Sequence, residues 1–117
     1  MHRLKDSASF ERVYRDSRSW ATPLLVLRAS PNDLPHSRIG YSVSKRIGKV
    51  VARNRLKRRM REAVRARLPR LAPGWDMVLI ARAPSGEAAF GEIGQALDLL
   101  FSRAGLWAQR PPEGSTG

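Results

Sequence analysis

Apolar residues recur at helical spacing in three stretches of the chain. Between residues 48 and 68 they repeat every four residues, which predicts a helix with one buried face. Ser7 and Ser85 are the expected N-caps of a first and a third helix, and Pro69 and Gly105 are expected to end the second and the third. The apolar positions are Phe10, Val13 and Tyr14 in the first helix, Ala52, Leu56, Met60, Ala63, Val64 and Leu68 in the second, and Phe90, Ile93, Leu97, Leu100, Phe101 and Ala104 in the third.

Three other stretches have the pattern of β-strands. Residues 23–29 and 75–81 are short apolar runs, which are typical of buried strands. Residues 38–44 alternate with period two, so their apolar side chains share one face and their small polar side chains share the other. Residues 16–22 are polar, and we expect them to form a turn.

These elements predict an α+β fold in which three helices pack on a small mixed β-sheet of three to four strands. Their order along the chain is α-β-β-α-β-α. A chain of 117 residues has the length of one domain, so we expect residues 1–107 to form a single domain. Residues 108–117 are rich in proline, glycine and serine, and we expect them to be a disordered tail.

Composition narrows the class of protein. The chain has no cysteine, which excludes disulfide bonds and thiolate metal sites. No apolar run reaches the roughly 18 residues that a membrane span needs, and the first residues lack the apolar stretch of a signal peptide. We therefore expect a cytoplasmic protein.

The positive charge of the chain is concentrated in one segment. The net charge of the chain is +12. Residues 45–70 contain 12 basic side chains and a single acidic one, Glu62, so the rest of the chain is nearly neutral. A solvated basic surface helix would be the simplest explanation, but so many like charges repel one another without a partner. The distribution therefore predicts that this segment binds a polyanion such as RNA.

A helical projection of this segment separates an apolar stripe from a broad cationic face. Arg53, Lys57 and Arg61 follow one another at four-residue spacing, which places them in a ridge along the edge of that face. For any one of Arg58, Arg59 or Arg67 taken singly, a solvated side chain is the favoured explanation, and only the whole set of cations indicates a binding surface. Binding to a membrane surface is an alternative for a basic amphipathic helix, but this stripe lacks Trp and Phe and is needed to cover the sheet.

The same segment carries a motif. Residues 38–62 read RIGYSVSKRIGKVVARNRLKRRMRE, which resembles the signature of the bacterial ribonuclease P protein family: a Gly-x-Ser-Val-Ser-Lys strand, a glycine, then Arg-Asn-Arg-x-Lys-Arg and Arg-Glu on a helix. Phe10-x-x-Val13-Tyr14 and residues 76–82 resemble the first helix and last strand of the family. The resemblance covers residues 3–104 and implies an RNA-binding domain of the ribonuclease P protein type, with a left-handed β-α-β crossover.

The resemblance also implies partners and site residues. Proteins of this family accompany a catalytic RNA that removes the 5′ leader of precursor tRNA, with Mg²⁺ held mainly by RNA and no cofactor on the protein alone. No membrane and no obligate protein partner are implied. The residues implied to contact the catalytic RNA are Lys45, Arg46, Lys49, Arg53, Asn54, Arg55, Lys57, Arg58, Arg61 and Arg65. Those implied to bind the leader are Phe10, Tyr14, Ser42 and Ser44.

Some alternatives stay open at this point. Without the resemblance, core packing is the favoured explanation of Phe10 and Tyr14, and the resemblance reverses this preference. Ser42 and Ser44 can be ordinary exposed strand serines. Arg28 stands where relatives often have an aromatic residue, so its role in a leader cleft is in doubt. A ribosomal or other structural RNA-binding protein would show a similar basic helix and small sheet.

The chain shows no sign of being a nuclease by itself. Its histidines, His2 and His36, have no neighbouring carboxylate in sequence, and no pair of carboxylates suggests a two-metal site. Asp76 opens a strand and is explained as well by a structural role. No glycine-rich phosphate-binding loop is present. We therefore expect no catalytic residue in this chain.

Overall fold

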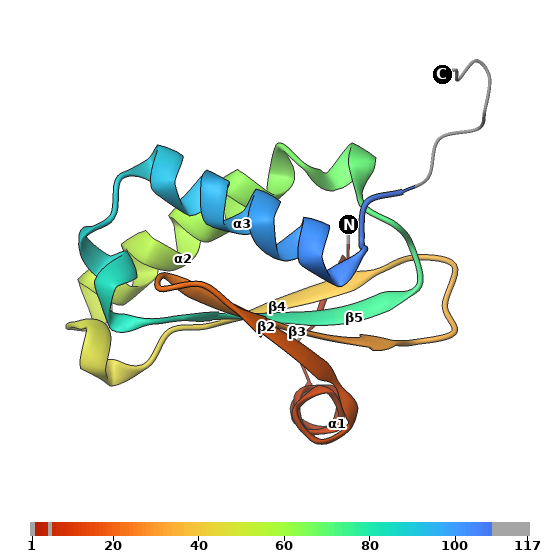
Figure 1. Cartoon of the computed structure of the whole chain (residues 1–117). Coiled ribbons are helices and arrows are strands. Elements are labelled where there is room, and N and C mark those ends of the chain that lie inside the picture. The colour runs from red at the N-terminus through yellow and green to blue at the C-terminus, as the bar shows by residue number, and fades with distance from the viewer. Residues whose placement is uncertain (1, 5, 109–117) are drawn as a thin grey trace, which may run out of the picture.

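The computed structural model describes residues 2–4 and 6–108, and it forms three layers. A mixed sheet lies in the middle, α2 (Val50–Arg65) and α3 (Phe90–Ala104) cover one face, and α1 (Ser7–Asp16) covers part of the other (Figure 1). The α+β class, the three helices and the small mixed sheet are confirmed. Most of the predicted tail, residues 109–117, lies outside the described residues. Ala108 is described, and its backbone N–H donates to the Arg70 carbonyl at 2.6 Å.

The sheet has the strand order β1-β4-β5-β3-β2. Its strands are β1 (His2–Arg3), β2 (Arg18–Ala21), β3 (Leu25–Pro31), β4 (Arg38–Ser42) and β5 (Trp75–Ala81). β4 and β5 are parallel neighbours joined through α2, so the crossover connection that the resemblance implies is present. Its handedness stays a prediction. β3 lies antiparallel to β5 on the other side.

Both edge strands were missed by the sequence analysis. The predicted turn over residues 16–22 contains β2, which pairs antiparallel with β3. Within β2 only Trp20 packs on the core, so the stretch has no apolar alternation to signal a strand. β1 is two residues long and pairs parallel with β4. β1 and β2 are strands only because they pair with β4 and β3, and the sequence alone does not show this pairing.

Two predicted N-caps were wrong. Asp6, not Ser7, caps α1, because the Asp6 carboxylate accepts a hydrogen bond from the Ser9 amide at 3.0 Å. α3 begins at Phe90, where the Glu92 carboxylate accepts from the Ala89 N–H at 2.7 Å. Ser85 is buried in a preceding 3-10 turn, where its hydroxyl donates to a backbone carbonyl.

The ends of α2 also differ from the prediction. The helix begins two residues after Gly48 and stops at Arg65, and short 3-10 helices over residues 45–47 and 68–70 flank it. Pro69 therefore lies in the second 3-10 turn and does not itself end α2. Gly105 does end α3, in the left-handed conformation (φ 69°) that glycine adopts without strain.

The larger core lies between the sheet and the helices α2 and α3. The predicted stripes of the second and third helices enter it, except that Phe90 and Ala52 are exposed and Leu68 and Ala104 are only partly buried. On the opposite face, α1 packs through a small cluster in which Leu4, Val13 and Val78 are fully buried. The two faces of the sheet are therefore stabilised very unequally, and α1 lies on the weaker side.

We expect Leu97→Ala to lower the free energy of unfolding by about 2–5 kcal/mol, because it leaves a cavity in the larger core. Leu97 is completely buried there. Urea denaturation followed by circular dichroism measures the change. Leu99→Ala, on the exposed side of the same helix, is the matched control and should change stability by about 0.5 kcal/mol or less. Equal losses in the two variants would contradict this packing.

Candidate RNA interface

The cations on the exposed face of α2 have no partners in the part of the chain that the structure describes. None of the side chains implied to contact RNA makes a hydrogen bond or ion pair with another described residue. The Nε atom of Arg53 is even buried without an acceptor. Outside α2, Lys45 and Arg46 lie in the 3-10 turn that follows β4, and Lys49 immediately precedes the helix. A cluster of unpaired cations of this kind is suited to binding phosphate groups.

Two other arginines of the same segment are used inside the protein. Arg59 donates to the Ala88 carbonyl at 3.2 Å. Arg67 forms a bidentate pair with Asp98 on α3, at 2.6 and 3.1 Å. The sequence suggested solvated side chains at both positions, and this was wrong, because an acceptor from the α3 side lies within reach of each. The basic residues of the segment thus divide into structural and available ones.

A hollow made of two cavities with shared lining residues lies between the cationic ridge and Phe10 of α1. Arg3, Tyr41 and Arg61 line two adjoining cavities at the sheet edge formed by β1 and β4. One of them, of about 210 Å³, also has Lys57 and Phe10 in its wall. Residues from α2 and from α1 therefore meet around one edge of the sheet. This brings together side chains that the resemblance assigned to two separate sites.

Arg3 and Tyr41 were not among the predicted site residues. Arg3 belongs to a two-residue strand that no pattern signals, and the alternation of β4 assigned Tyr41 to the core. Burial raises the pKa of Tyr41 to about 12. The Tyr41 hydroxyl is protonated at neutral pH with or without this shift, and it can donate a hydrogen bond in this hollow.

On the opposite face of the sheet, Phe10 lies directly against the backbone of Gly40. A Cβ atom at residue 40 would come within 2.4 Å of the Phe10 ring, so the close approach requires glycine there. The rings of Phe10 and Tyr14 are roughly parallel, with centroids 6.5 Å apart. Phe10 is half-buried and Tyr14 is 40% exposed, so the pair forms an accessible aromatic surface. Core packing alone does not account for Tyr14.

Arg28 extends this aromatic surface. Its guanidinium lies 5.4 Å from the centroid of the Tyr14 ring and donates to the Tyr14 carbonyl and the Ser17 hydroxyl at 3.2 and 3.3 Å. The cation therefore stacks on an aromatic ring and anchors the end of α1 to β3. Arg28 thus adds a positive charge beside the pair of aromatic rings.

The two serines implied to bind the leader lie in different surroundings. Ser42 pairs with Ile80 in the sheet and alternates with Gly40, so it faces the side on which α1 lies. The Ser44 hydroxyl instead accepts a hydrogen bond from the Arg46 amide and caps the 3-10 turn. Ser42 is thus a candidate for this surface. Among the described contacts, nothing joins Ser44 to it.

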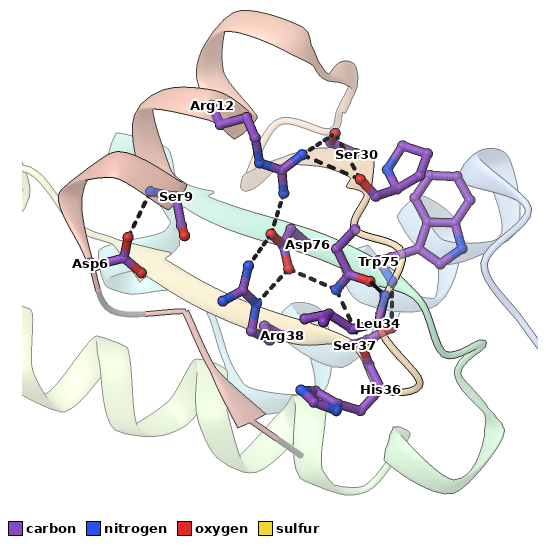
Figure 2. Close-up of polar contacts among 12 residues, drawn as sticks. Asp6, Ser9, Arg12, Ser30, Leu34, His36, Ser37, Arg38, Trp75 and Asp76 are labelled. Carbon is purple, nitrogen blue, oxygen red and sulfur yellow. Dashed lines mark hydrogen bonds and ion pairs between the residues drawn. The ribbon is translucent and has the colours of Figure 1, made fainter.

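A buried carboxylate ties α1 to the sheet. Asp76 at the start of β5 is completely buried, and Arg38 of β4 binds it with two hydrogen bonds of 2.8 and 2.6 Å (Figure 2). Asn32 donates to the same carboxylate at 2.9 Å, and Arg12 of α1 approaches it from the other side. The structural explanation of Asp76 is therefore supported by four donated hydrogen bonds.

Among the described residues, no helix combines the length and the apolar character that a membrane span requires. In the same part of the chain, no three His, Asp or Glu side chains lie close enough to hold a metal ion together.

The geometry defines a class of protein, a small α+β domain that presents unpaired cations beside an aromatic surface. The ribonuclease P family model matches residues 1–105. The ribonuclease P protein component of Roseiflexus castenholzii is 47% identical over 106 residues, which cover 90% of this chain and 87% of the relative. The corresponding protein of Clostridioides difficile is 38% identical over 104 residues, covering 88% and 91%.

Solved structures agree with these matches. The ribonuclease P protein of Staphylococcus aureus superposes with a TM-score of 0.84 at 30% identity, covering 92% of this chain and 99% of that one. The Thermotoga maritima protein superposes with a TM-score of 0.77 at 28% identity, covering 86% and 96%. This chain belongs to the ribonuclease P protein family, whose members are RNA-binding components of a ribonucleoprotein that processes tRNA.

We expect the Asp76 cluster to make stability depend on acid pH. Burial by itself raises the pKa of Asp76, but hydrogen bonds from Arg38, Asn32 and Arg12 outweigh it, and the pKa is lowered. A carboxyl whose pKa is lower when folded stabilises the protein above its unfolded value of about 3.9, and this contribution is lost as pH falls through the folded value. Urea denaturation at pH 7 and at successively lower pH measures it.

In Asp76→Asn the corresponding part of the pH dependence should be missing. An unchanged pH profile in this variant would contradict the role of the cluster. Asp16→Asn, at an exposed ion pair with Arg15, is the control.

Proposed function

We propose that this ribonuclease P protein binds the catalytic RNA through the cationic face of α2 and binds the 5′ leader of precursor tRNA on the α1 side of its sheet. In this proposal the RNA carries out the metal-dependent hydrolysis that releases the leader. The protein supports the active RNA conformation and improves substrate affinity in the cytoplasm. One observation carries the proposal: the cations of this face lack partners among the residues that the structure describes, whereas neighbouring arginines are bonded internally.

Binding to folded RNA is favoured by the shape of the face. Lys57, Arg61 and Arg65 follow the hollow at the edge of β1 and β4, and the buried stripe of α2 holds the helix rigidly against the sheet. A row of cations on a rigid helix can bind successive phosphates of an RNA backbone. The cost of binding is small, because the helix that carries the cations needs no rearrangement. Asn54 is exposed on the same helix and can add a contact to a base or a 2′-hydroxyl.

Binding of a single-stranded leader is favoured by the aromatic surface. Phe10 and Tyr14 offer ring faces on which unpaired bases stack, and Arg28 offers a positive charge beside them. Such a combination binds single strands with little dependence on sequence. Phe10 lines the same cavity as Lys57 and Arg61. A leader bound on the α1 side would therefore extend toward the catalytic RNA bound on α2.

In this proposal the protein alone binds no cofactor, and Mg²⁺ is bound mainly by ligands of the RNA. The rival hypothesis is a structural RNA-binding protein without a processing role. Cleavage kinetics separate the two, because a structural protein leaves the reaction rate of the catalytic RNA unchanged.

We expect the chain to accelerate cleavage of precursor tRNA when it is added to a bacterial ribonuclease P RNA at low magnesium concentration. Protein cations then replace part of the magnesium that screens the phosphates of RNA and substrate. Release of the 5′ leader, resolved on a gel, measures the rate. The protein incubated without the RNA subunit is the control and should release no leader. An unchanged rate in the reconstituted mixture would contradict the proposed function.

We expect the double variant Lys57→Ala, Arg61→Ala to weaken binding to the catalytic RNA without loss of folding. The dependence of affinity on salt should also become shallower, by roughly one unit of slope per removed phosphate contact. For the unchanged protein, six to ten contacts would give a loss of about 10³–10⁵ in affinity between about 50 and 200 mM salt. Filter binding over that range measures both quantities.

The matched control is Arg15→Ala with Arg18→Ala, which removes the same charge from exposed positions away from α2. This control should keep most of the affinity. Equal losses in the two double variants would show that net charge, and not the face of α2, determines binding.

A further inference from the structure

We propose that Asp76 is a positioning residue for leader recognition: by holding Arg12 and Arg38 together, it fixes α1 in the orientation that presents Phe10 and Tyr14 to the leader. This inference rests on the proposed function. It concerns a group that lies outside the hollow and that the leader itself need not touch.

The arrangement of α1 links Asp76 to the aromatic pair. Arg12 lies two residues after Phe10 and two residues before Tyr14, so the contact with Asp76 is made from the middle of the aromatic segment. Arg12 also donates to the Ser30 hydroxyl and the Pro31 carbonyl, at 3.2 and 3.3 Å (Figure 2). This one side chain therefore joins α1 to the ends of both β3 and β5.

Apolar packing alone defines the orientation of α1 poorly. The cluster beneath the helix has only Leu4, Val13 and Val78 fully buried, whereas α2 and α3 share a core several times larger. Apolar contact is non-directional, so a small cluster permits the helix to rotate or slide. Hydrogen bonds to a fixed carboxylate are directional and restrict such movement.

Asp76 has donors outside α1. Arg38 binds both of its oxygens and Asn32 binds Oδ1, so three of the four hydrogen bonds to the carboxylate come from other parts of the fold. Arg28 ties the last turn of the helix to β3 through the Tyr14 carbonyl. The helix is thus held at its middle by Asp76 and at its end by Arg28. Stacking on both rings requires both attachments, because base–aromatic contacts depend on the distance and tilt of each ring.

The test uses the holoenzyme reconstituted from the full chain and a bacterial ribonuclease P RNA. Two precursor tRNAs are compared, one with a leader of a single nucleotide and one with a leader of about eight nucleotides. For Asp76→Asn we expect KM to rise about tenfold for the long-leader substrate, which corresponds to the loss of one base–aromatic stack. KM for the short-leader substrate, kcat for both substrates and affinity for the catalytic RNA should stay unchanged.

Arg12→Gln provides a second variant that does not disturb the centre of the cluster, because a third of the Arg12 side chain is exposed to solvent. It should reproduce the leader-specific increase in KM even if Asp76→Asn does not fold. Arg12→Lys keeps a cation beside the carboxylate and should restore part of the affinity. Asp98→Asn is the matched control, since it removes the α3 carboxylate that binds Arg67, away from α1. It should leave the advantage of the long leader intact.

Each outcome decides the inference. A long-leader advantage that survives Arg12→Gln and any folded Asp76→Asn protein would overturn the positioning role while leaving the proposed function standing. Equal increases in KM for both substrates, or the same effect in Asp98→Asn, would also overturn it, because general loosening of the fold would explain them. If the unchanged holoenzyme showed no long-leader advantage, the leader surface of the proposed function would fail first, and the inference with it.

Discussion

The structure depends on how a large excess of basic side chains is distributed over few acceptors. The chain has 22 Lys and Arg residues and 10 Asp and Glu residues, so most cations have no carboxylate available. The carboxylates that are buried or half-buried each bind arginine: Asp76 holds Arg12 and Arg38, and Asp98 holds Arg67. Further arginines bond to backbone carbonyls at the ends of strands and helices. The cations on the exposed face of α2 have no such acceptor. They repel one another, and a bound polyanion would neutralise this repulsion. Arginine side chains thus stabilise the fold where an acceptor lies within reach. Where no acceptor lies within reach, they are left available to bind RNA.

The sheet serves as the support between two different surfaces. Its α2 face carries a large apolar core, which holds the cationic helix rigidly, whereas its α1 face carries a small cluster and an accessible aromatic pair. The hollow at the edge of β1 and β4 joins the two, with Arg3, Tyr41 and Arg61 shared between its parts. An RNA bound on one side and a single strand bound on the other would therefore meet at this edge. The weaker docking of α1 makes the polar cluster around Asp76 the means of setting the geometry on that side (Figure 2).

Elements were predicted correctly from the sequence where many residues share one hydrophobic pattern, and they were missed where the element is short or polar. α2 and α3 were predicted because their apolar stripes extend over several turns, and β5 because nearly all its residues are buried. β1 and β2 were missed because a two-residue edge and a polar edge strand have no periodicity of their own, and they exist only through pairing with β4 and β3. The predicted RNA-binding residues lie on α2 and in the segment before it, without side-chain partners among the described residues, and their role in binding RNA stays a prediction. Of the four leader residues, Phe10, Tyr14 and Ser42 face the α1 side, and Ser44 instead caps a turn.

By itself, the sequence determined the fold class, the cationic helix and the family, since these follow from periodicity, local charge density and a motif that is contiguous along the chain. Only the tertiary structure decided which arginines are bound internally, because Arg59 and Arg67 are indistinguishable from Arg58 until folding brings Ala88, just before α3, and Asp98 of α3 beside them. It also decided that Arg28 stacks on Tyr14 and that Arg12 reaches Asp76, 64 residues further along the chain. These contacts join segments remote in sequence, and a charged side chain carries no local signal of the partner that folding will place against it.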